Sequence, residues 1–185
     1  MIADEVRSAR GFESQKEKIM HNLLKADVFA QIFSQSRFHL QIAQRSVDII
    51  KLYISEKNFK QQHIDMLWDS TLVDESALIE VYRIIQDTSP SLPDEIIECF
   101  IAKITDSMEP SKVTAREVEF LYSIGKNAYY KSQARQSAIS GLWKIFMQEK
   151  PGYSRSLAKQ SRKHFCDLLR NMDSEYREDF IKRSI

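Results

Sequence analysis

The sequence predicts an all-α protein of about nine or ten helices, and three observations support this prediction. Apolar residues recur at helical spacing through most of the chain, and no window shows the period of two expected of a strand. Glycine and proline supply 8 of the 185 residues, well below their usual combined share of about 12%. The chain is also 43% hydrophobic, so it can bury a core and need not be disordered.

Residues 15–58 are predicted to form entry helices. Their apolar positions are Ile19, Leu23, Leu24, Val28, Phe29, Ile32 and Phe33, followed by Ala43, Val47, Ile50 and Ile54. The last four recur at i, i+4, i+7 and i+11, which places them on one face of a helix. We expect these helices to lead into the repeated part of the fold.

Residues 59–110 are predicted to form a short helix followed by two longer ones. The apolar stripes are Ile64, Leu67, Trp68 and Thr71, then Leu78, Val81, Tyr82 and Ile85, then Ile97, Phe100, Ile101, Ile104 and Met108. We expect Asp74 to cap the second helix, because its carboxylate can accept a free backbone N–H. Pro93 is expected in the first turn of the third helix, where its missing N–H is not needed.

Residues 114–172 are predicted to repeat this order. The stripes are Val118, Leu121 and Ile124, then Ala134, Ala138, Leu142 and Ile145, then Phe165, Leu168, Leu169 and Met172. Thr114 and Glu117 have the spacing of a capping box, in which each side chain satisfies a free N–H group. The first helix of this segment is therefore expected to begin just after Thr114.

The helix that contains Trp143 has an unusual interior residue, Gly141. Glycine in a helix interior costs about 1 kcal/mol relative to alanine. We therefore expect close contact with a neighbouring helix at Gly141. Pro151-Gly152 is expected to end this helix, since neither residue continues a helix well.

Two hexamers suggest an internal repeat. His63–Trp68 and Glu117–Tyr122 share the order polar, aliphatic, acidic, apolar, Leu, aromatic, at an offset of 54 residues. Each is followed by two longer helices, which is the unit of armadillo-like and HEAT-like solenoids. The sequence thus predicts a single helical-repeat domain over 1–185, a right-handed α-solenoid segment rather than a closed bundle. Residues 174–185 are expected to form a truncated tail helix, because solenoid ends need polar caps.

The sequence predicts no catalytic, cofactor-binding or metal-binding residue. The four histidines, which lack metal-ligand spacing, are His21, His39, His63 and His164. Cys166 lies two residues from His164 on a helix, so their side chains diverge by about 200° and cannot form a nucleophile–base pair. Cys99 falls nearly opposite its apolar stripe and is expected to be a partly exposed thiol. The chain also has no Gly-rich phosphate loop.

Residues 27–68 carry a pattern that resembles a known family. The matching positions are Ile32-Phe33, His39-Leu-Gln-Ile42, a long helix to Glu56, and His63-Ile-Asp65 with Leu67-Trp68. This pattern is similar to the N-terminal helical-repeat region of the very large fat-facets-type ubiquitin-specific proteases. The resemblance implies armadillo-like repeats that precede a papain-like catalytic domain. The family's cysteine and histidine boxes are absent here, so the chain would be a non-catalytic fragment of a deubiquitinase.

The charges of the chain are unevenly distributed. Residues 1–110 carry 12 Lys+Arg and 18 Asp+Glu, whereas residues 111–185 carry 15 and 8. Five cations fall on one flank of the last long helix on a helical wheel: Arg155, Lys159, Arg162, Lys163 and Arg170. Two interpretations are open. The cations could pair with Glu175, Glu178 and Asp179 of the tail, or they could bind an acidic partner.

The predicted function is therefore a protein-interaction scaffold that recruits substrates or regulators of a deubiquitinase. Stacked helices suit this role because they expose an extended surface without a catalytic pocket. The alternative is a nucleic-acid-binding helical module that uses the basic segment 123–165. The expected partners are other proteins, with no membrane, and no cofactor is expected. The polar N-terminus and the two cysteines favour the cytoplasm or the nucleus.

Overall fold

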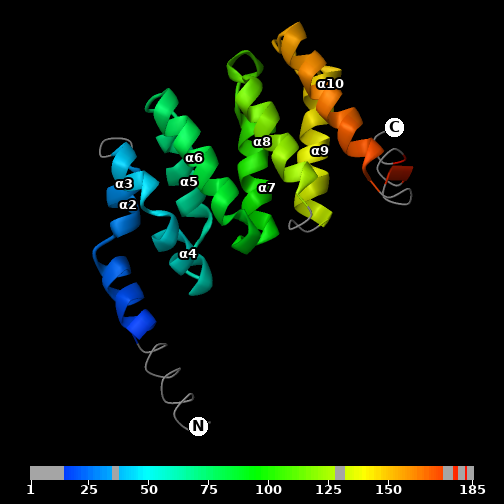
Figure 1. The fold of residues 1–185 in the computed structure, drawn as a ribbon. Helices are drawn as coiled ribbons and strands as arrows, with labels where there is room; N and C mark the ends of the chain where they lie inside the picture. Colours follow the sequence, from blue (N-terminus) through cyan, green and yellow to red (C-terminus); the bar gives the residue numbers. More distant parts are fainter. Residues whose placement is uncertain (1–14, 35–37, 128–131, 173–176, 179–181, 183–185) are drawn as a thin grey trace, which may run out of the picture. The chain divides into compact units, whose positions relative to one another are not determined.

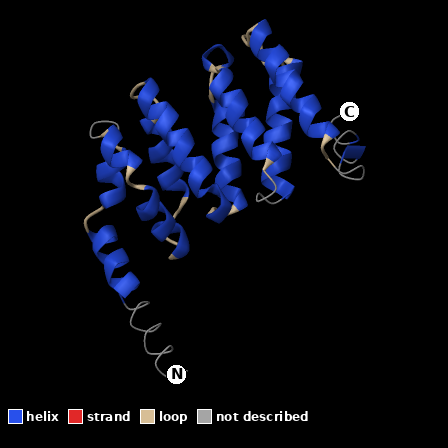
Figure 2. Ribbon diagram, viewed as in Figure 1, coloured by secondary structure: helices blue, strands red, loops and turns tan. Residues whose placement is uncertain are grey.

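The computed structural model describes residues 15–34, 38–127, 132–172, 177–178 and 182. Every regular element among them is helical, which confirms the all-α prediction (Figure 1, Figure 2). Helical residues 15–25 and helices α2 to α10 give ten α-helices in this described part, in line with the expected number. The chain divides into two compact units, Met1–Ser91 and Leu92–Ile185, which are taken in turn.

The first unit is built from helices of at most 14 residues. They are residues 15–25, α2 (Val28–Phe33), α3 (Leu40–Gln44), α4 (Val47–Ser55), α5 (Gln61–Ser70), α6 (Glu75–Thr88) and the 3₁₀-helix η1 (Ser89–Ser91). Helix α5 packs against α2 and α6, and α6 also packs against α3 and α4. Asp74 caps α6 as predicted, since its carboxylate accepts the Ala77 N–H at 2.8 Å.

An aromatic cluster joins α2, α4 and α5 in the core of this unit. The Phe29 ring lies at its centre, 4.8 Å from Phe33, 5.5 Å from Tyr53, 5.9 Å from Phe59 and 4.6 Å from His63 between ring centroids. Phe29, Phe33 and Tyr53 are each 1% exposed. One ring thus contacts residues of three helices and of the α4–α5 turn, so the cluster holds this unit together.

His63 is the polar member of this aromatic cluster, and it is buried. Its Nδ1 atom accepts a hydrogen bond from the Lys60 N–H at 2.8 Å, which closes the first turn of α5. Burial lowers the pKa of His63 below the ordinary value of 6.5, and the Lys60 ammonium acts in the same direction. The Asp27 carboxylate opposes this shift. The neutral ring is therefore the form that the folded chain favours.

This burial predicts a pH-dependent stability. The unfolded chain takes up a proton near pH 6.5, while the folded chain takes it up only at lower pH. The free energy of unfolding should therefore be fully retained above about pH 6.5 and fall as the pH is lowered toward the folded pKa. His63→Gln can still accept the Lys60 N–H but does not titrate. Urea unfolding should show a smaller pH slope for this variant over the same range, and an unchanged slope would contradict the assignment.

The second unit contains the two longest helices of the described residues, α9 (Ser132–Met147) and α10 (Arg155–Arg170), with 16 residues each. Its other helices are α7 (Asp94–Ala102), the π-helical continuation η2 (Lys103–Ser107), the 3₁₀-helix η3 (Pro110–Lys112) and α8 (Ala115–Lys126). Helix α9 packs against α7, α8 and α10, so it is the central helix of this unit (Figure 1). The predicted stripe of α9 is fully buried at Ala134, Ala138, Leu142 and Ile145.

Two local predictions in this unit are confirmed. Thr114 and Glu117 form the predicted capping box: Thr114 Oγ1 accepts the Arg116 N–H at 3.2 Å, and Glu117 accepts the Thr114 N–H at 2.6 Å. Gly141 is closely packed, because a Cβ atom there would lie 2.8 Å from Cγ2 of Thr105.

Two boundaries differ from the sequence-based expectation. Pro93 lies before the first turn of α7, as its N-cap residue, and it supplies no side-chain cap. Helix α9 ends at Met147 rather than at Pro151, because Gln148 adopts a left-handed conformation with φ of 54°. Both differences are short shifts, and they leave the helices themselves in place.

The repeat order remains a prediction. The division between the two units falls inside residues 59–110, which the sequence groups as one short–long–long series. Residues 174–185, the expected tail helix, lie mostly outside the described part of the chain, and only residues 177–178 and 182 are described there.

Candidate functional site

The candidate site lies on α10, whose sequence separates an apolar face from a charged one. Ser154 starts the helix, since its hydroxyl accepts the Leu157 N–H at 3.2 Å. The buried face comprises Leu157, Ala158, Ser161, Phe165 and Leu168. It packs against α8 and α9, and the Ser161 hydroxyl donates to the Leu142 carbonyl of α9 at 2.7 Å. These contacts fix the rotation of α10, and with it the direction in which its charged face points.

The five predicted cations all lie on α10 and are all exposed. They are named here the basic flank: Arg155, Lys159, Arg162, Lys163 and Arg170. Within the described residues none of them forms an ion pair. Arg162 alone has a ring contact, with its guanidinium 5.7 Å from the centre of the Phe146 ring. The structure therefore places the predicted residues together on one solvent-facing surface.

The tail acids were the expected internal partners of this flank. Of these, Glu178 lies 3.9 Å from Lys182, so it pairs within the tail. Glu175 and Asp179 lie outside the described residues. Pairing between the basic flank and the tail stays a hypothesis for these two acids.

On the other flank of α10, the polar side chains form hydrogen bonds with side chains of α8. Glu119 accepts a hydrogen bond from Gln160 at 2.8 Å, and its Oε1 atom lies 2.8 Å from Nε2 of His164. The Tyr122 hydroxyl donates to Asp167 at 2.6 Å, and its ring stacks on His164 at 4.1 Å. This hydrogen bond raises the pKa of Tyr122. Sequence reasoning missed these contacts, since the partners are 41 to 45 residues apart.

The described cations of the basic segment 123–165 also fall into two groups, those with contacts inside the unit and those of the basic flank. Four of these cations contact neighbouring groups within the unit. Arg135 donates to the Gly125 carbonyl, Lys144 pairs with Asp106 at 2.9 Å, and Lys150 donates to the carbonyls of Thr105 and Asp106. Lys126 lies over the Tyr122 ring at 5.5 Å. Within the described residues, four of the five exposed cations of this segment therefore lie on α10.

The described residues do not assemble a metal cluster of three or more His, Cys, Asp or Glu. Cys99 and Cys166 are free thiols and half-buried, and the partial exposure of Cys99 matches the prediction. His63, the buried histidine, is surrounded by aromatic rings, and His164 is held by Glu119. These contacts are with rings and a carboxylate, so the surroundings of His63 and His164 do not indicate a thiol–imidazole pair.

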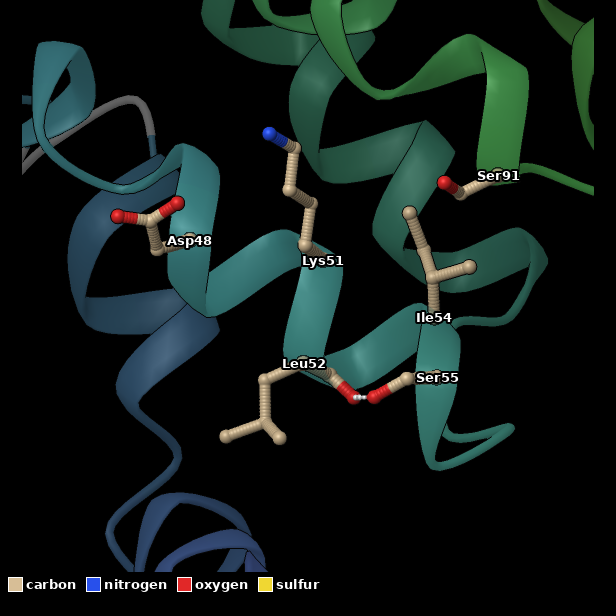
Figure 3. A pocket seen from close by; sticks show the side chains of 6 residues that line it. All are labelled: Asp48, Lys51, Leu52, Ile54, Ser55 and Ser91. Carbon is tan, nitrogen blue, oxygen red and sulfur yellow. Dashed lines mark hydrogen bonds between the residues drawn. The ribbon is translucent and has the colours of Figure 1, made fainter.

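The first unit has a shallow hollow of about 500 Å³ beside α4. Figure 3 shows its lining residues, which are Asp48, Lys51, Leu52, Ile54, Ser55 and Ser91. The Ser55 hydroxyl is already used, since it donates to the Leu52 carbonyl at 3.0 Å. Asp48 and Lys51 are exposed to solvent. The hollow is open and its lining presents no convergent set of polar groups, so α10 remains the stronger candidate site.

Comparison of the chain with family models, with curated proteins and with solved structures gave no match. In the described residues, no helix has both the length and the apolar character needed to cross a bilayer.

Proposed function

We propose that this chain is a non-catalytic protein-interaction module that binds an acidic segment of a partner protein through the basic flank. One observation carries the proposal: five exposed cations share one flank of α10 without an ion-pair partner among the described residues, while the cations on neighbouring helices are engaged internally. Like charges at this spacing reinforce one another within a screening length of about 10 Å. An acidic partner would relieve their mutual repulsion.

The resemblance of residues 27–68 extends the proposal to a parent protein. On that basis the module belongs to a large deubiquitinating cysteine protease and recruits its substrates or regulators. The all-helical fold supports this proposal, as it agrees with the helical-repeat region of that family. A reading frame that continues into a cysteine box and a histidine box would test it directly.

The same resemblance leads us to propose a right-handed solenoid arrangement of the helices. A closed bundle of this length would have a radius of gyration of about 16 Å. A solenoid is more extended, so small-angle scattering should give a clearly larger value. A radius at the compact value would contradict the solenoid.

Charge reversal tests the docking surface. Lys159→Glu with Lys163→Glu should weaken binding of a fluorescein-labelled oligoglutamate peptide by about tenfold or more at low salt, because each exposed ion pair contributes up to about 1 kcal/mol. Both side chains are exposed, so the thermal midpoint should change little. Arg162 is left intact because it contacts the Phe146 ring.

The matched control is Lys51→Glu with Lys60→Glu, which makes the same change in net charge on exposed positions of the first unit. This control should leave the anisotropy titration nearly unchanged. Equal losses in both double variants would show that only net charge matters and would overturn the docking surface. Tighter binding of single-stranded DNA of equal charge, lost on reversal of Lys159 and Lys163, would favour the nucleic-acid alternative.

A further inference from the structure

An apolar cluster at the end of α9 adjoins the basic flank at Arg162, which contacts the Phe146 ring. Trp143 and Phe146 of α9 are half-buried, and their rings form a cluster with Phe165 at centroid distances of 5.1 and 6.3 Å. Met147, the last residue of α9, is 51% exposed. Arg162 spans the two surfaces, since its guanidinium lies over the Phe146 ring. The second unit thus presents a row of cations on α10 that meets, at Arg162, an apolar cluster at the end of α9.

The spacing of the cations matches a helical partner. Arg155, Lys159, Arg162 or Lys163, and Arg170 lie at i, i+4, i+7 or i+8, and i+15 on α10, a length of about 22 Å at 1.5 Å per residue. An acidic helix with the same periodicity can place a carboxylate against each cation. Its apolar stripe, on an adjacent face of the same helix, can then meet the Met147 and Trp143 side chains.

Two observations disfavour nucleic acid as the occupant. Single-stranded nucleic acid binds by stacking bases on open aromatic rings, whereas the Trp143 ring is packed against both Phe146 and Phe165. The flexible Met147 side chain is 51% exposed, whereas Trp143 and Phe146 are half-buried, and it suits an aliphatic or aromatic side chain of a protein partner. The surface therefore combines charge with apolar contact.

We infer that the joint α9–α10 surface binds an acidic amphipathic helix, with carboxylates on the basic flank and apolar side chains on Met147 and Trp143. This inference rests on the proposed function and specifies the class of partner. It predicts that the order of residues in the partner matters as well as its charge. An extended acidic peptide without an apolar face would contact the cations of the basic flank but not Met147 and Trp143.

Two labelled peptides of about sixteen residues, matched to the length of α10 at 1.5 Å per residue, provide the test. One is designed as a helix with a glutamate face and an adjacent leucine face; the other has the same composition in an order that mixes the two faces. The segregated peptide should bind about tenfold more tightly. Met147→Ser should weaken the segregated peptide about threefold, since it removes part of one apolar contact, and should leave the mixed peptide unaffected.

Leu72→Ser is the matched control, because Leu72 is an exposed apolar residue of the first unit, 64% exposed. Equal binding of both peptides, with no effect of Met147→Ser, would overturn the inference while the acidic-segment function stands. No binding of either peptide would overturn both. If the chain self-associates and the Lys159→Glu, Lys163→Glu variant does not, the inference of a separate helical partner would be wrong. The surface would then bind a second copy of the chain.

Discussion

Replacing Phe29 with alanine is expected to destabilise the first unit by about 3–5 kcal/mol. Phe29 is 1% exposed and contacts four aromatic rings, so its removal leaves a cavity that residues from several elements must fill. Such a loss is a large share of the free energy of unfolding of a typical protein, which is about 5–15 kcal/mol. This variant should therefore be substantially unfolded at moderate temperature.

The stability of the first unit can be measured separately from that of the second. Trp68 lies in the first unit and Trp143 in the second, so a Trp143→Phe background leaves Trp68 as the fluorescent reporter during urea unfolding. Ile79→Ala is the control, because Ile79 is 48% exposed on α6; exposed substitutions usually change stability by less than about 0.5 kcal/mol. Similar losses for Phe29→Ala and Ile79→Ala would contradict the packing of the aromatic cluster.

The helices themselves could be predicted because their signals are local. The stripe of Val118, Leu121 and Ile124 reflects the period of a single helix, and all three residues are fully buried. Capping by Asp74 is likewise set by residues within one turn. Local patterns of this kind identify an element and its inward face without any knowledge of its neighbours.

Contacts between helices could not be predicted in the same way. The aromatic cluster brings Phe29, Tyr53 and His63 together from three helices, and a single-helix pattern does not encode their meeting. His63 is an example, because its position in the sequence gives no indication that aromatic rings surround it. The bond between Tyr122 and Asp167 joins residues 45 positions apart and depends on the packing of α8 on α10.

The same distinction between local patterns and contacts between helices applies to the candidate site. A helical wheel of α10 is sufficient to place Lys159 and Lys163 on one flank, and the structure confirms that both are exposed. It could not show that Lys144 and Lys150 are held by Asp106 and neighbouring carbonyls. Knowledge of those internal contacts is what separates the basic flank from the rest of the basic segment.

Gly141 is a point of close approach between α9 and its neighbours. A Cβ atom at this position would lie 2.8 Å from Cγ2 of Thr105 in η2 and 3.3 Å from Cδ1 of Leu121 in α8. Thr105 is branched at Cβ and is 4% exposed, so its methyl group has little room to move. The glycine therefore permits a three-way contact that a larger residue would force apart.

Gly141→Val should destabilise the second unit by about 3 kcal/mol, because overpacking must displace α8 or η2. Urea unfolding followed by Trp143 emission in a Trp68→Phe background would measure this loss. Ser140→Val inserts the same side chain one residue earlier, at a half-buried position on the same helix, and should cost less than about 1 kcal/mol. Equal costs at both positions would contradict this prediction, because they would mean that the close approach at Gly141 does not determine how α9 packs.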